Sequence, residues 1–294
     1  MTVGRLMVQA QAALAGALGL APSEARIEVQ MLLARALGDV ARAWLLAHEQ
    51  DPVAPERQAA FNSLLDRRLV GEPVAYILGE REFFGLTFKV TPATLIPRPE
   101  TELLVEMALQ HLPSPQPSPA SGRGRGSLFR VLDLGTGSGA IALSIAHARP
   151  EAEVLACDAS FAALAVACAN AQRLGIANAA LLQSNWYSAL AAQRFDLIVS
   201  NPPYVAAGDP HLQHGDLRFE PPAALASGSD GLEDIRHIVA GAPAHLHPGG
   251  WLLLEHGYDQ AAQVRELLRE AGLVEVFSAR DLSGIERVSG GCLT

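Results

Sequence analysis

The sequence predicts an α/β protein with a doubly wound, mostly parallel sheet, preceded by a small N-terminal helical bundle and a linking β-hairpin. From Phe129 onward, short apolar strand-like runs alternate with helical segments. Residues 1–71 carry helical periodicity, and residues 72–95 change to a two-residue period. We therefore divide the chain into a helical domain at 1–71, a hairpin linker at 72–95 and a larger domain at 96–294.

The helical domain is predicted from apolar residues that recur at steps of three and four. Leu6, Ala10 and Leu14 mark the first stripe, and Gly19 ends it. In the linker, the alternating pattern predicts an extended segment that already includes Tyr76, Ile77 and Leu78. No catalytic set of residues appears in this part of the sequence.

The larger domain contains seven strand-like segments with helical patterns between most of them. A Pro-, Ser-, Gly- and Arg-rich stretch at 113–127 interrupts it and is predicted to be a flexible insertion. In a doubly wound sheet the first four strands take the order 3-2-1-4, so the first and fourth are neighbours. The seven segments are 130–134, 153–157, 180–183, 195–200, 251–255, 274–277 and a last one near 286–288.

Composition narrows the classes of function. Hydrophobic residues make up 49% of the chain and charged residues 18%, which is typical of a globular protein with a sizeable core. The net charge of −9 argues against a broad surface that binds nucleic acid, so no direct nucleic-acid partner is expected. Cys157, Cys168 and Cys292 have no metal-site or redox spacing, which favours a reducing, cytoplasmic location. No run approaches the ~20 apolar residues of a membrane span.

A glycine-rich turn follows the first predicted strand, and its backbone can pass close to a ligand. The segment Gly135-Thr136-Gly137-Ser138-Gly139 precedes a helix whose first N–H groups are unpaired. Asp158 ends the second strand, where a carboxylate can accept both ribose hydroxyls of a nucleoside. The turn alone fits NAD or S-adenosylmethionine. Asp133, just before the turn, suits the α-ammonium group of S-adenosylmethionine better than a pyrophosphate, directly or through water.

The fourth strand, 195–200, ends at Asn201-Pro202-Pro203-Tyr204. Two prolines cannot continue a sheet, so the turn presents the Asn201 amide, backbone carbonyls and the Tyr204 ring at the carboxyl end of the strand. These groups suit a planar –NH2 group. Because the first and fourth strands are neighbours, the glycine turn and Asn201 are expected to face one crevice, which favours the methyl donor over NAD.

These motifs resemble the class I S-adenosylmethionine-dependent methyltransferases, with their seven-stranded Rossmann-like sheet. Within that class the chain is similar to the release factor glutamine methyltransferases, the PrmC/HemK family. The Asn-Pro-Pro-Tyr turn is common to amide and amine methylation. The narrower match is Leu95-Ile96-Pro97-Arg98-Pro99-Glu100-Thr101-Glu102 after a helical domain, together with Asp216–Pro221 and Leu254–Gly257.

The resemblance implies methyl transfer to the side-chain amide nitrogen of the glutamine in the Gly-Gly-Gln motif of peptide chain release factors. S-adenosyl-L-methionine would be the donor and S-adenosyl-L-homocysteine the product. The cofactor contacts carried over by position are Gly135, Thr136, Gly137, Ser138, Gly139, Asp158, Trp186 and Asn201. The substrate contacts carried over are Asn201, Pro202, Pro203 and Tyr204, of which Asn201, Pro202 and Tyr204 are expected to be catalytic.

The chain departs from the family pattern in two places. Its insertion at 113–127 is longer than expected, and Asn185 stands where an aspartate is expected before the aromatic residue. An adenine-specific nucleic-acid methyltransferase with the same turn is the first alternative, and a nucleotide-binding module without catalysis is the second. The residues Asp209, His211, His214 and Asp216 are close in sequence, but we expect a polar loop there and no metal.

Overall fold

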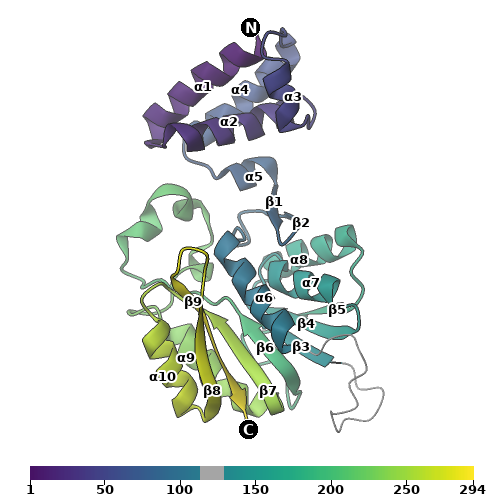
Figure 1. Cartoon of the computed structure of the whole chain (residues 1–294), viewed down its shortest axis with the longest axis vertical. Coiled ribbons are helices and arrows are strands. Elements are labelled where there is room, and N and C mark those ends of the chain that lie inside the picture. Colours follow the sequence, from purple (N-terminus) through teal and green to yellow (C-terminus); the bar gives the residue numbers. More distant parts are fainter. Residues whose placement is uncertain (113–128) are drawn as a thin grey trace. The chain divides into compact units, whose positions relative to one another are not determined.

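The computed structural model describes residues 1–112 and 129–294 (Figure 1). The predicted insertion at 113–127 lies outside the described residues. The described residues form two compact units. The first consists of Met1–Glu80 with Gln213–Phe219, and the second of Arg81–Leu212 with Glu220–Thr294.

The first unit is a small helical bundle. Pro22 and Pro55 each occupy the first turn of a helix, where a missing N–H costs nothing, and Gly19 ends the first helix in the left-handed conformation. The core includes large side chains that are at most 1% exposed, among them Leu14, Leu32 and Phe61. The helices are α1 (Val3–Leu18), α2 (Pro22–Ala36), α3 (Arg42–Ala47), α4 (Pro55–Leu69) and α5 (Val74–Leu78).

The extended segment predicted at Tyr76–Leu78 is wrong, because these residues form α5. Pro73 sits at the start of this helix with a φ of −57°, and Gly79 ends it with a φ of 75°. Proline at a helix start and a left-handed glycine just after its end outweigh the short two-residue apolar pattern between them. The predicted hairpin does form, later in the linker, from β1 (Glu80–Phe83) and β2 (Leu86–Lys89).

The second unit is built on a seven-stranded sheet in the order β5-β4-β3-β6-β7-β9-β8. The first five strands of this order pair in parallel, and β9 pairs antiparallel with both β7 and β8. The predicted fold class and the predicted order of the first four strands are confirmed. The strands are β3 (Phe129–Leu134), β4 (Ala152–Asp158), β5 (Ala179–Gln183), β6 (Phe195–Ser200), β7 (Leu246–Glu255), β8 (Leu273–Arg280) and β9 (Glu286–Leu293).

Helices cover both faces of this sheet (Figure 1). Side chains alternate along each strand, so Val131 and Val199 pack into a core shared with α6 and α7, while Leu132 and Ile198 pack with α9 on the other face. The helices are α6 (Glu102–His111), α7 (Ala140–Ala148), α8 (Phe161–Leu174), α9 (Glu233–His245) and α10 (Ala261–Glu270).

The parallel register brings the carboxyl ends of four strands to one edge of the sheet. Leu134 of β3 pairs with Cys157 of β4 and with Ser200 of β6, and Ser200 also pairs with Leu254 of β7. The residues that follow these positions therefore lie along one edge, which is where ligands bind in doubly wound sheets.

Candidate active site

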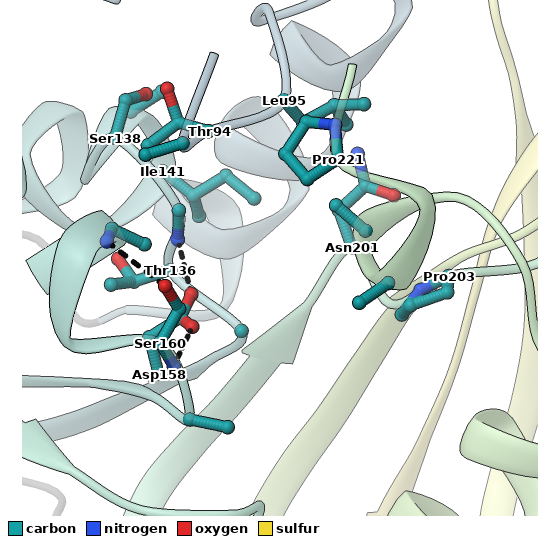
Figure 2. Close-up of a pocket in the computed structure, with 18 of the residues that line it drawn as sticks. Thr94, Leu95, Thr136, Ser138, Ile141, Asp158, Ser160, Asn201, Pro203 and Pro221 are labelled. Atoms are coloured by element: carbon teal, nitrogen blue, oxygen red, sulfur yellow. Dashed lines mark hydrogen bonds between the residues drawn. The ribbon is translucent and has the colours of Figure 1, made fainter. Parts of the chain in front are cut away.

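A cavity of about 360 Å³ lies at this edge of the second unit. Figure 2 shows Thr136 and Asp158 on one side of it, and Asn201, Pro203 and Pro221 on the other. The predicted site residues that line it are Gly135, Thr136, Gly137, Ser138, Asp158, Trp186, Asn201 and Pro203. The predicted residues Gly139, Pro202 and Tyr204 are outside this lining.

The glycine turn adopts a backbone that only glycine accepts easily. Gly135, Gly137 and Gly139 have φ values of 73°, 57° and 83°. A Cβ on Gly139 would come within 2.9 Å of Leu143, so this glycine also allows α7 to begin close to its neighbours. A Cβ on Gly137 would meet no described atom within 4 Å, so the backbone there borders open space in the cavity.

Asp158 fixes the shape of the turn. Its Oδ2 accepts a hydrogen bond from the Gly137 N–H at 2.9 Å, and its Oδ1 accepts one from the Ser160 N–H at 2.8 Å (Figure 2). Each carboxylate oxygen retains a further lone pair. Asp158 lines the cavity, so these lone pairs can accept hydrogen bonds from ligand hydroxyls, as the sequence suggested.

Asp133 is buried beneath the turn and is not among the residues that line the cavity, so its suggested contact with the ligand, directly or through water, stays a prediction. Its Oδ2 accepts hydrogen bonds from the Thr136 hydroxyl at 2.6 Å and from the Ala142 N–H in the first turn of α7 at 3.2 Å. Burial raises the pKa of Asp133 to about 7, and these two hydrogen bonds offset part of the increase. The side chain therefore joins the turn to the helix.

These contacts discriminate between the two ligands that the sequence left open. A pyrophosphate needs free N–H groups at the turn and at the helix start. Here the Gly137 N–H is bonded to Asp158 and the Ala142 N–H to Asp133, so the chain's own carboxylates occupy both donors. An uncharged ribose and a positively charged amino-acid end fit this surrounding, and the residues present fit S-adenosylmethionine better than NAD.

Trp186 closes the nucleoside end of the cavity. Its ring lies over Gly135, where an added Cβ would be 3.4 Å from the indole. Asn185 is exposed beside Trp186 and also lines the cavity. Asn185 departs from the family pattern, and it lies where the aspartate of that pattern was expected to act.

Asn201 stands at the opposite end, directly after β6. Its Nδ2 donates a hydrogen bond to the Thr101 hydroxyl at 3.2 Å. Its Oδ1 is buried and has no hydrogen-bond partner within the part of the chain that the structure describes. A buried acceptor without a partner is costly.

Tyr204 lies behind this wall. Its hydroxyl is 3.3 Å from Glu255 Oε1, and its backbone carbonyl accepts a hydrogen bond from Gln260 Nε2 at 3.0 Å. Burial and the neighbouring Glu255 carboxyl raise the pKa of Tyr204 above its usual range, so the phenol stays protonated at neutral pH. Tyr204 therefore serves as a hydrogen-bond donor in this structure.

The rim next to Asn201 is made by two segments that are far apart in the sequence. Arg98 pairs with the buried Glu220, whose other carboxylate oxygen accepts the Ile96 N–H at 2.9 Å. Pro221 follows Glu220 directly and lines the cavity together with Leu95. The sequence analysis did not identify Glu220 as the partner of Arg98.

The sequence cluster of aspartates and histidines was expected to be a loop, but most of it forms two short 3-10 helices, Pro210–Gln213 and Gly215–Phe219. The Asp209 carboxylate accepts the His211 backbone N–H at 2.8 Å and contacts its ring, while Asp216 pairs with Arg68 in the first unit. Across residues 1–112 and 129–294, no group of three His, Cys, Asp or Glu side chains is arranged to hold a metal. Within the same ranges, every helix is too short or too polar to span a membrane.

Two family profiles match the chain. The profile described as "Methyltransferase small domain" matches residues 119–216, and the profile described as "PrmC N-terminal domain" matches residues 6–79. Among solved structures, the hMettl16 catalytic domain has a TM-score of 0.55 at 16% identity and covers 79% of this chain and 82% of its own. The T. thermophilus 16S rRNA N2 G1207 methyltransferase has a TM-score of 0.50 at 24% identity, covering 73% of this chain and 50% of its own. These likenesses show the fold alone.

Sequence relatives cover nearly the whole chain. The release factor glutamine methyltransferase of Bordetella pertussis is 57% identical, over 92% of this chain and 96% of its own length. The proteins of the same name from Xylella fastidiosa and Pseudomonas aeruginosa are 54% and 51% identical, over 90% and 91% of this chain and 92% of their own lengths. At this identity and coverage, the chain belongs to the release factor glutamine methyltransferase family of class I methyltransferases.

Proposed function

We propose that the protein transfers a methyl group from S-adenosylmethionine to the side-chain amide nitrogen of the glutamine in the Gly-Gly-Gln motif of peptide chain release factors. The observation that carries this proposal is that Asn201, the first residue of the Asn-Pro-Pro-Tyr turn, lines the same cavity as the glycine turn and Asp158. The names of the relatives at 51–57% identity support the same substrate. Release factors act in translation, so the proposal also places the protein in the cytoplasm.

The turn residues Gly135–Ser138, with Asp158 and Trp186, would hold the donor. When bound, S-adenosylmethionine supplies an electrophilic methyl group on a positively charged sulfur. The solved T. thermophilus methyltransferase of the same fold is described as a complex with AdoMet, which supports this assignment. The chain's own part is to hold the acceptor nitrogen in line with that methyl group and to exclude water from the crevice.

A carboxamide nitrogen is a weak nucleophile because its lone pair is delocalised into the carbonyl. Asn201 Oδ1 would accept one amide hydrogen of the substrate, and the Pro202 carbonyl would accept the other. Two acceptors favour positive charge that develops on the nitrogen during transfer. The Tyr204 ring would pack on the amide plane. Pro202 and Tyr204 are outside the cavity lining, so their roles rest on the family motif.

The test uses the full chain, labelled S-adenosylmethionine and a purified release factor. Peptide mass mapping should place one methyl group on the glutamine of Gly-Gly-Gln. A release factor with that glutamine replaced by alanine should take up no label. The variant Asn201→Ala should lose turnover while it still binds S-adenosylmethionine with an affinity close to that of the wild type.

The same assay separates the proposal from the alternative of adenine methylation. DNA and RNA oligonucleotides are offered in parallel to the release factor. Label on adenine without label on the release factor would contradict the proposal. Tight binding of S-adenosylmethionine without transfer to any of these acceptors would favour a binding module instead.

A further inference from the structure

The Asn-Pro-Pro-Tyr turn depends on contacts at its two ends. Pro202 and Pro203 have no N–H group, so neither can donate a hydrogen bond that would fix the backbone between them. At the start of the turn, Ser200 of β6 pairs with strands on both sides, and its hydroxyl donates to the Leu134 carbonyl at 2.6 Å. The other end of the turn follows the strand and is held by a side chain from another element.

This side chain is Gln260, directly before α10. Its Nε2 donates a hydrogen bond to the Tyr204 backbone carbonyl at 3.0 Å, and its Oε1 accepts one from the Gly257 N–H at 2.8 Å. Gln260 is 7% exposed, so water competes little for these two partners. The side chain therefore joins the turn after β6 to the residues that follow β7.

The two partners of the Gln260 amide decide its orientation. A backbone N–H can only donate and a backbone carbonyl can only accept. The oxygen must therefore point to Gly257 and the –NH2 group to Tyr204. Gly257 is itself held, because its carbonyl accepts the Gln260 backbone N–H at 3.1 Å and contacts His256 Nδ1 at 2.9 Å. Gln260 thus holds Tyr204 from a well-fixed part of the chain.

Gly231 leaves the space in which this hydrogen bond forms. Its φ is 76°, and a Cβ there would lie 2.3 Å from the Tyr204 oxygen and 2.8 Å from Gln260 Nε2. A side chain at this position would push the carbonyl and the amide away from their present places. The contact between Gln260 and Tyr204 is therefore accommodated by a third segment, the one that leads into α9.

We propose that Gln260 is a positioning residue for methyl transfer, which holds the Tyr204 backbone and thereby keeps Asn201 and Pro203 in place. The proposal rests on the proposed function, because this turn is expected to hold the acceptor amide. Asn201 and Pro203 line the cavity and Gln260 does not, so Gln260 acts through the backbone of the turn. Without this donor the turn is supported only at its other contacts, and small displacements of a reacting group slow catalysis strongly.

The test compares Gln260→Met and Gln260→Glu with the control Gln263→Met. Methionine has a similar length but no hydrogen to donate to Tyr204. Gln263 is exposed on the same helix and does not line the cavity. In Gln260→Met we expect the single-turnover rate of transfer to the release factor to fall roughly 10- to 100-fold. In Gln263→Met the rate should stay within about twofold of the wild type.

Two further measurements show that the loss is confined to the acceptor side. Each variant should bind S-adenosylmethionine within about threefold of the wild-type affinity, because the glycine turn and Asp158 are unchanged. Each variant should also unfold above the assay temperature. A transfer rate in Gln260→Met within about twofold of the wild type would overturn the proposal.

Gln260→Glu gives a readout that weaker packing alone would not produce. A protonated carboxyl can accept from Gly257 and donate its O–H to Tyr204, as the amide does, whereas the ionised carboxylate has no hydrogen for the Tyr204 carbonyl. Burial raises the pKa of a carboxyl above its usual value of about 4.3. The rate of this variant, divided by that of Gln260→Met, should therefore rise at least about fivefold as the pH falls from about 8.5 to about 5.5.

Division by the rate of Gln260→Met removes the titration of the surrounding groups, because both variants share them. The titratable groups on the segments around Gln260 are Tyr204, Asp230 with its partner Arg236, Glu255, His256 and Asp259. A ratio that does not change with pH would show that donation to Tyr204 is not what Gln260 contributes, and would overturn the proposal.

A failure of the proposed function remains distinguishable. The wild-type protein is assayed beside the variants, and absence of transfer by the wild type would refute the function alone. Hydrogen exchange then decides the inference, because the Val205 N–H belongs to the same peptide group as the Tyr204 carbonyl and donates to the Leu225 carbonyl at 2.9 Å. The Val205 N–H should exchange at least about 10-fold faster in Gln260→Met than in Gln263→Met. Equal exchange rates would contradict the positioning role.

Discussion

Replacement of Gly137 by alanine should weaken cofactor binding in addition to straining the fold. Gly137 has a φ of 57°, and an alanine there costs about 1–2 kcal/mol of strain. Its Cβ would meet no described atom within 4 Å, so the added methyl group would enter the open space of the cavity. We expect the affinity for S-adenosylmethionine to fall at least 10-fold, which is about 1.4 kcal/mol, in titration calorimetry.

The matched control is Gly175→Ala. Gly175 ends α8 with a φ of 68°, and a Cβ there likewise has no described atom within 4 Å, but the residue does not line the cavity. Both variants should lose similar stability in urea unfolding, and only Gly137→Ala should lose affinity. Equal affinities in the two variants would show that the space beside Gly137 is not occupied by the cofactor.

Three further outcomes are expected. Asp158→Asn should weaken S-adenosylmethionine binding by about 10-fold or more in calorimetry. The Asp158 carboxylate accepts hydrogen bonds from two loop N–H groups, and in the variant an amide N–H would face one of these two donors. Arg68→Ala should lower the free energy of unfolding by about 1–3 kcal/mol, because it removes a buried guanidinium and leaves the Glu28 carboxylate, which is only 14% exposed, without its ion pair. The control Arg67→Ala, at a pair that is 44% exposed on the arginine side, should cost less than about 1 kcal/mol. Burial raises the pKa of Glu255 from 4.5 to about 7, so the folded state binds the carboxyl proton more tightly than the unfolded state does. The stability that this proton adds is present below pH 4.5 and is lost as the pH rises to about 7. Glu255→Gln should remove roughly 3 kcal/mol of that pH-dependent loss, measured by urea unfolding at pH 4.5 and pH 8; an unchanged pH dependence would mean that Glu255 is not protonated in the folded protein.

The sheet could be predicted because its signals are local. Each parallel strand is a short apolar run, helical patterns follow most of them, and crossover connections have one hand. The strand order then follows, and it brings the Gly135 turn and Asn201 to one edge before any side-chain contact is known. α5 was misassigned because a five-residue apolar segment carries too little periodicity to separate a helix from a strand.

The rim of the site could not be predicted in this way. Arg98 and Glu220 are 122 positions apart, and neither residue has a local pattern that names the other. Their pairing depends on how the segment after β6 returns to the cavity. The same holds for Arg68 and Asp216, which are 148 positions apart and meet in the first unit. Long-range ion pairs of this kind are set by tertiary packing and leave no periodic trace in the sequence.

Glu255 could be predicted in part, unlike the ion pairs at the rim. A carboxylate that ends the apolar run Trp251–Leu254 conflicts with the burial of its strand, and such a conflict often marks a functional position. No partner for it could be read from the sequence, because the Tyr204 hydroxyl comes within 3.3 Å of Glu255 Oε1 only when β6 and β7 pair in parallel. This pairing brings the turn after β6 and the end of β7 to the same edge of the sheet, and burial there raises the pKa of both side chains above its usual value. A buried pair that no local pattern predicts thus lies behind the wall that Asn201 forms.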